Sequence, residues 1–237
     1  MRLVTELMAV DEPAWPELKA ALHGDPGIVV LPVTQTAGQD CLHRLQVTAR
    51  SYLGALALHT GGLLVDHGWL RVLGGGSERG LPSLAHANQV PAGRQSPPPL
   101  LVGHDVLGGR FEVNGRDPAA VGRPGEPGDV CYFAPDSLEW EGLSVGHAGW
   151  LTWIAAGGHT AFYESLRWPG WQEETRELPL THGIAVQPVL WSHEARRDLA
   201  ATHRRPVPMH ELFVLQQDFA ATLATLPDGT AVQIDVT

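Results

Sequence analysis

The chain has almost no lysine, little cysteine and no long apolar run. Lys19 is the single lysine among 16 basic residues, and the two cysteines, Cys41 and Cys131, lie far apart without a CxxC spacing. A disulfide framework is therefore not expected, which favours a cytoplasmic protein. No apolar run of about 18 residues occurs, so no membrane-spanning helix is expected. Acidic residues interrupt the N-terminal segment where a signal peptide would need an apolar core.

Positive charge is scarce as well. The 16 basic residues face 26 acidic ones, which gives a formal net charge of −10 with histidine neutral. This charge argues against a nucleic-acid binder that neutralises phosphates and against docking on an anionic membrane. With 237 residues, of which 43% are hydrophobic, the chain can bury one sizeable core.

The order of predicted elements is helices, then strands, then helices. The stretch GGLLVDHGWLRVLGGG, residues 61–76, predicts a strand, a turn at Asp66–His67–Gly68 and a second strand. We expect an α+β fold: a mostly antiparallel sheet over residues 61–141, flanked by helices. Candidates for its core are Trp69, Leu70, Val72, Phe111, Tyr132 and Phe133.

The segment that follows residue 146 has a different character. Helical patterns cover 147–157, 159–168, 170–178 and 208–223, with one strand predicted in 184–191 and a terminal strand in 228–237. Pro-rich residues 90–99 and Gly/Pro-rich residues 115–128 are expected to be loops. We expect a core at 1–157 and a mainly helical C-terminal extension at 158–237, packed together as one globular unit.

A phosphate or metal site is not favoured. The Gly74–Gly76 loop lacks the lysine of a phosphate-binding P-loop and does not open a long helix. Asp66–His67 and His104–Asp105 are ordinary turn residues, and neighbouring residues on a strand point to opposite faces. We therefore expect no metal and no cofactor.

The strongest catalytic signal is GLSVG, residues 142–146, which matches the GxSxG nucleophile motif. Asp198 and either His203 or His210 follow Ser144 in the order that a hydrolase triad requires. However, the preceding strand SLEWE is half exposed, whereas a nucleophile strand is normally buried and apolar. The preferred interpretation places Ser144 in the turn before a helix, and a serine hydrolase using Ser144 is the alternative.

Negative charge concentrates in residues 124–180, which carry nine acidic and two basic residues. Glu139 and Glu141 should face solvent if Trp140 points inward, because side chains alternate along a strand. Either the charge is a solvated surface or it is a docking surface for a basic protein partner. The candidate binding residues are Glu139, Glu141, Trp168, Trp171, Glu173, Glu174 and Glu177, with the two tryptophans of RWPGW as apolar anchors.

Several long phrases carry a family resemblance. GALALHTGGLLVDHGWLRVLGGG, LPSLAHAN, VGHDVLGGRFEVNG, GDVCYFAPDSLEWEGL and AFYESLRWPGW together resemble a bacterial family of uncharacterised proteins, defined as a domain of unknown function. The resemblance spans about Trp15 to Gln216.

The order of these phrases is also similar to the SUKH superfamily of small α+β proteins. That resemblance implies an antiparallel sheet flanked by helices and a role as an immunity protein that binds and neutralises a toxin. The N-terminal helices and the extension beyond about residue 158 depart from the superfamily pattern. The combined expectation is a cytoplasmic binding protein rather than an enzyme.

Overall fold

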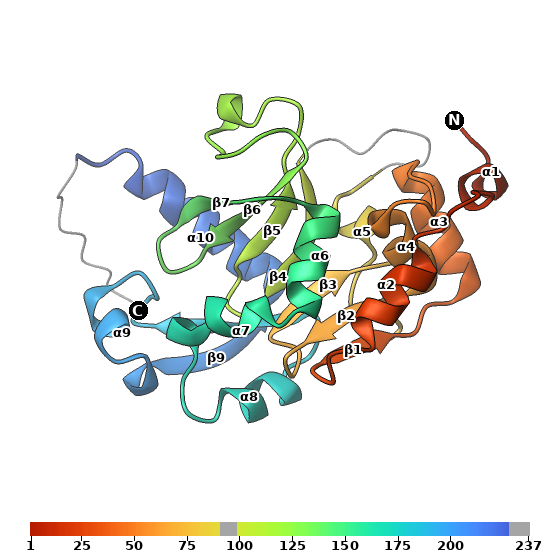
Figure 1. Cartoon of the computed structure of the whole chain (residues 1–237). Helices are drawn as coiled ribbons and strands as arrows, with labels where there is room; N and C mark the ends of the chain where they lie inside the picture. The colour runs from red at the N-terminus through yellow and green to blue at the C-terminus, as the bar shows by residue number, and fades with distance from the viewer. Residues whose placement is uncertain (91–98, 228–237) are drawn as a thin grey trace.

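The computed structural model describes residues 1–90 and 99–227 (Figure 1). Its centre is a seven-stranded antiparallel sheet in which the strands lie side by side in chain order. The strands are β1 (Ile28–Leu31), β2 (Gly62–Val65), β3 (Leu70–Leu73), β4 (Leu100–Asp105), β5 (Arg110–Val113), β6 (Asp129–Ala134) and β7 (Glu139–Gly146). The expected α+β fold with an antiparallel central sheet is confirmed, and the sheet extends beyond the expected 61–141 at both ends.

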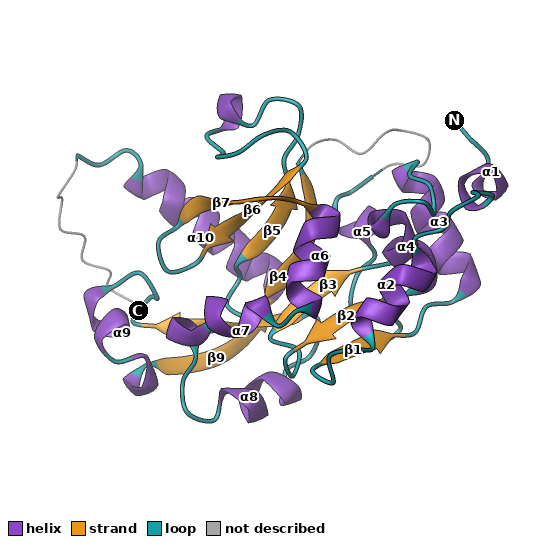
Figure 2. Cartoon of the chain, in the orientation of Figure 1, coloured by secondary structure: helices purple, strands orange, loops and turns teal. Residues whose placement is uncertain are grey.

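Helices surround this sheet (Figure 2). The helices of the core are α1 (Val4–Met8), α2 (Trp15–Leu22), α3 (Gln35–Leu45), α4 (Tyr52–His59), α5 (Leu84–Ala87) and α6 (His147–Ala155). Those that follow are α7 (Gly158–Phe162), α8 (Trp171–Glu177), α9 (His193–Arg197) and α10 (Met209–Leu223). Side-chain caps define several starts, as where the Thr34 hydroxyl accepts the Ala37 N–H at the beginning of α3.

The sheet is covered on both faces. Phe111 of β5 meets Trp150 of α6 with ring centroids 5.0 Å apart, so α6 packs on one face. His104 of β4 meets Phe213 of α10 at 5.7 Å on the other face. All six predicted core residues are buried, and strand alternation divides them between the two faces.

The C-terminal extension contains a second sheet that the sequence did not reveal. Strand β8 (His182–Gln187) pairs antiparallel with β9 (His203–Pro208). Strand β8 overlaps the predicted strand 184–191 at residues 184–187. Strand β9 could not be predicted, because its sequence HRRPVP contains two prolines, which are depleted in strands. The extension is mainly helical, as expected, and carries this two-stranded sheet in addition.

Within the part of the chain that the structure describes, no helix combines the length and the apolar character that crossing a bilayer requires. Most of the predicted loop at 90–99 and the predicted terminal strand at 228–237 lie outside the described residues.

Candidate functional site

The turn of the first hairpin is held by ion pairs rather than arranged as a chelate. Asp66 forms an ion pair with Arg167, and the nearest nitrogen of His159 lies 3.9 Å from the same carboxylate oxygen. His67 lies 2.9 Å from the guanidinium of Arg176. Across residues 1–90 and 99–227, no group of three or more His, Cys, Asp or Glu could hold a metal ion.

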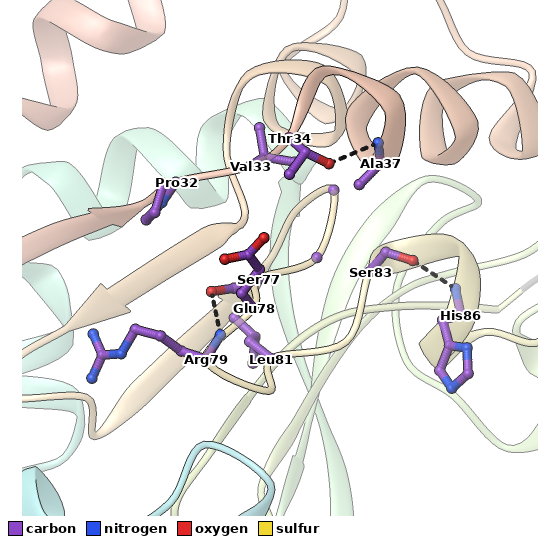
Figure 3. A pocket seen from close by; sticks show the side chains of 12 residues that line it. Pro32, Val33, Thr34, Ala37, Ser77, Glu78, Arg79, Leu81, Ser83 and His86 are labelled. Atoms are coloured by element: carbon purple, nitrogen blue, oxygen red, sulfur yellow. Dashed lines mark hydrogen bonds between the residues drawn. The ribbon is translucent and has the colours of Figure 1, made fainter.

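The Gly74–Gly76 loop borders a hollow of about 570 Å³ (Figure 3). The opposite side of the hollow is formed by the β1–α3 junction and the start of α5. A Cβ at Gly74 would lie 2.6 Å from the Thr60 carbonyl oxygen, so glycine allows this close backbone approach. The hydroxyls at the rim accept backbone N–H groups, as where Ser83 accepts His86 N–H at 3.1 Å. None of the sequence-predicted site residues lines this hollow.

The two anchor tryptophans are buried. Only 2% of Trp168 and 9% of Trp171 is exposed, and both rings pack around Trp69, with centroids 5.6 and 5.2 Å from its ring. Arg167 stacks on Trp171 at 4.3 Å. The RWPGW turn therefore folds back onto the domain, and its indole rings are not presented to solvent as contact anchors.

The acidic helix α8 is partly neutralised by the basic segment that follows it. Glu174 forms an ion pair with Arg204 at 3.2 Å and accepts the Trp168 indole N–H at 2.9 Å. Glu173 and Glu177 are exposed, but Arg204 and Arg205 line the same groove as Glu177. Strand β7 lies far from α8, near the opposite side of the molecule (Figure 1). The acidic stretch 124–180 is therefore divided into two separate patches.

The other patch is an acidic surface on strand β7 and the turn before it, formed by Asp136, Glu139 and Glu141. Glu139 and Glu141 are both exposed, while Trp140 between them is half-buried, so the predicted alternation holds. Partial burial raises the pKa of Glu141, and the neighbouring carboxylates of Asp136 and Glu139 raise it further. The guanidinium of Arg196 lies beside the patch and donates to the Asp136 carbonyl oxygen at 2.7 Å, whereas Glu139 and Glu141 have no ion-pair partner among the described residues.

The environment of Trp140 could not be predicted from the sequence. Its ring lies under the guanidinium of Arg123 at 3.9 Å, and Arg110 approaches it at 5.6 Å. Arg123 is itself fixed by an ion pair with Glu112 at 2.5 Å, in which both side chains are about nine-tenths buried. The cross-strand neighbour Phe133 packs against Trp140 at 5.3 Å. The only indication of this stacking in the sequence is a tryptophan between two glutamates, at residues 139–141.

Ser144 lies in an exposed part of the edge strand β7, not in a nucleophile elbow. Gly142 pairs with Cys131 and Gly146 with Asp129, so residues 143–145 bulge opposite the single residue Val130. The left-handed backbone of Ser144, with φ of 54°, serves this bulge. Among the described residues no hydrogen bond joins Ser144 to a histidine.

Asp198, the candidate acid of the hydrolase triad, caps the turn that follows it by accepting the Ala201 N–H at 3.2 Å. The two candidate bases, His203 and His210, are both exposed. A hydrolase with a GxSxG nucleophile has a mainly parallel sheet, whereas the central sheet of this chain is antiparallel.

The chain also holds a buried polar cluster between the sheet and the extension. Asp105 is fully buried, accepts the Tyr132 hydroxyl at 2.7 Å and accepts the N–H groups of Leu107 and Gly109 at 2.9 Å. Burial lowers the pKa of its neighbour His104 to about 3. The cluster orders the β4–β5 turn, because Asp105 accepts two backbone N–H groups of that turn.

Comparisons with known proteins place the chain among uncharacterised bacterial proteins. A family model described as "Protein of unknown function DUF2625" matches residues 4–212. The chain is 35% identical over 227 residues to "Putative uncharacterized protein YbfG" of Escherichia coli (strain K12), covering 94% of this chain and 99% of that protein. It is 30% identical over 182 residues to an "Uncharacterized protein" of Haemophilus influenzae (strain ATCC 51907 / DSM 11121 / KW20 / Rd), covering 75% and 78%. No solved structure matches the chain.

Proposed function

The chain belongs to the family of proteins of unknown function DUF2625, and we propose that it is a cytoplasmic binding protein that docks a basic protein partner on strand β7. The observation that carries the proposal is the pair of exposed carboxylates, Glu139 and Glu141, which flank the half-buried Trp140 in sequence and share the opposite face of the strand. A basic partner would be steered towards this surface by long-range attraction, while apolar contact would supply affinity.

We further propose that the partner is a toxin, which this chain neutralises by protein–protein contact. Two features support it: the order of sequence phrases in residues 61–154, which is similar to that of the SUKH superfamily with its immunity proteins, and an acidic surface that suits a nuclease built to hold nucleic acid. The lack of a partner for the Ser144 hydroxyl among the described histidines favours binding over the serine hydrolase alternative.

Capture followed by an inhibition assay tests this function. The tagged protein is used to capture partners from the native host, and each captured protein is identified, purified and returned to the protein in equal amounts. We expect a basic protein whose own activity falls as the complex forms. Capture of acidic proteins alone, or of a basic protein whose activity is unaffected by saturating amounts of this chain, would contradict neutralisation.

A further inference from the structure

Strand β7 is the longest of the nine strands in the described chain and lies at an edge of the central sheet. It pairs only with β6, and none of its eight residues is buried. Apart from that ladder, the one hydrogen bond to the main chain of residues 139–142 among the described residues joins the Glu139 N–H to the Ser137 hydroxyl at 3.3 Å. An edge strand leaves alternate backbone N–H and C=O groups unpaired, which makes it a template for another strand.

The edges at β1 and β9 are less suited to accept a strand. Strand β1 has four residues and is followed directly by Pro32. Strand β9 carries Pro206 and Pro208, two residues apart and therefore on one side of the backbone, where proline removes the N–H donors. Strand β7 carries no proline. Its bulge at 143–145 limits regular pairing to residues 139–142.

From this edge and its side chains, we propose that the basic partner adds an extended segment to β7, with basic side chains beside Glu139 and Glu141 and an apolar one against Trp140. The inference deepens the proposed function and rests on it. Main-chain hydrogen bonds supply affinity in this mode of recognition, and the alternating side chains supply specificity.

The side chains of β7 decide which segment fits. On one face, Glu139 and Glu141 stand two residues apart, so a paired strand would place two alternate residues beside them. On the other face, Trp140 is held between Phe133 and Arg123 and offers an ordered apolar surface. A second copy of this chain is disfavoured in the register centred on Trp140, because antiparallel pairing of two β7 strands would then oppose Glu139 to Glu141.

A synthetic peptide provides the test without knowledge of the natural partner. The probe is the capped octapeptide Lys-Val-Lys-Tyr-Lys-Val-Lys-Val, and its control has the same sequence with N-methyl groups at alternate residues. The control keeps every charge but loses backbone donors. We expect the probe to bind the full chain and the control to bind about tenfold more weakly, the equivalent of one to two net hydrogen bonds. Amide exchange at residues 139–142 should slow only with the probe.

Three variants of the protein complete the design. Glu139→Gln/Glu141→Gln should weaken binding of the probe about tenfold, whereas Glu173→Gln/Glu177→Gln, which removes the same charge from α8, should change it less than about twofold. Trp140→Leu, which keeps an apolar side chain, should weaken binding of the probe. It should leave the amide-exchange pattern of strand β7 in the free protein unchanged.

The outcomes separate the two claims. If probe and control bind equally and both depend on Glu139 and Glu141, strand addition is wrong while an acidic docking surface stands. If neither peptide binds, or if binding ignores the glutamates, strand addition is overturned. If a basic partner captured from the host also ignores the glutamates, the proposed function fails with it.

Discussion

The guanidinium of Arg71 donates a hydrogen bond to the carbonyl oxygen of Leu180 at 3.0 Å, across 109 residues of sequence. The same nitrogen donates to the His182 carbonyl at 2.7 Å, and the Arg71 side chain is fully buried. A central strand of the sheet is thereby joined to the segment that leads into β8. These contacts fasten the C-terminal extension to the central sheet.

Arg71→Met tests this link. The substitution keeps much of the side-chain volume but leaves the Leu180 and His182 carbonyls without a donor, which should cost about 3 kcal/mol or more of unfolding free energy. Urea unfolding followed by tryptophan fluorescence measures the loss, with Arg79→Met at an exposed position as the control. A loss below about 1 kcal/mol would show that the extension does not depend on Arg71.

Tyr132→Phe tests the buried cluster around Asp105. The variant removes the hydroxyl that donates to the Asp105 carboxylate while leaving the ring contact with Phe111. We expect a loss of about 1–3 kcal/mol, because a fully buried carboxylate loses a donor. Equilibrium denaturation measures it, and Tyr52→Phe, at a half-buried tyrosine on α4, serves as the control. Equal effects of the two substitutions would contradict the role of this hydrogen bond.

Acid sensitivity should arise partly from His147. Burial lowers the pKa of its imidazole to about 4, and neither ring nitrogen has a hydrogen-bond partner in the described chain. Between that value and the unfolded pKa of about 6.5, the unfolded chain binds a proton that the folded chain does not, so stability falls as the pH is lowered.

We expect His147 to lower the free energy of unfolding by about 1–2 kcal/mol between pH 7 and pH 5. Denaturation of wild type and of His147→Gln over this range measures the difference in slope, and His86→Gln, on an exposed histidine, is the control. Identical slopes for wild type and His147→Gln would contradict the assignment.

The hydrolase alternative has its own test at Ser144. Because the hydroxyl lacks a histidine partner, a fluorophosphonate probe should leave the protein unlabelled. Ser144→Gly should be neutral or stabilising by up to about 1 kcal/mol, since glycine adopts the positive φ of this position without strain. Labelling of the wild type that disappears in Ser144→Ala would favour the hydrolase instead.

The central sheet could be predicted because its strands carry clear local signals. The Asp66–His67–Gly68 turn and the Gly108–Gly109 bend separate short apolar runs of alternating character, and pairing between sequence neighbours follows from tight turns. Strand β9 carries no alternating apolar pattern. Its prolines are compatible with a strand only at the edge of a sheet, and the sequence does not show that this segment lies at an edge.

The candidate site was less predictable because charge pairing is a tertiary property. Glu139 and Glu141 could be placed on the solvent side from strand alternation alone. The neutralisation of Glu174 by Arg204, 30 residues later, could not be foreseen from the composition of either segment. The burial of Trp168 and Trp171 likewise depends on Trp69, about a hundred residues earlier in the chain.

The dissociation constant of a purified basic partner, identified by capture from the host, tests the central claim most directly. It is measured for wild type, Glu139→Arg/Glu141→Arg and the α8 control Glu173→Arg/Glu177→Arg at low and high salt. An acidic docking surface on β7 predicts at least about tenfold weaker binding for the β7 variant at low salt, little change for the control, and a smaller difference at high salt. Equal affinity of all three proteins at both salt concentrations would contradict it, and the charge on β7 would then serve only solubility.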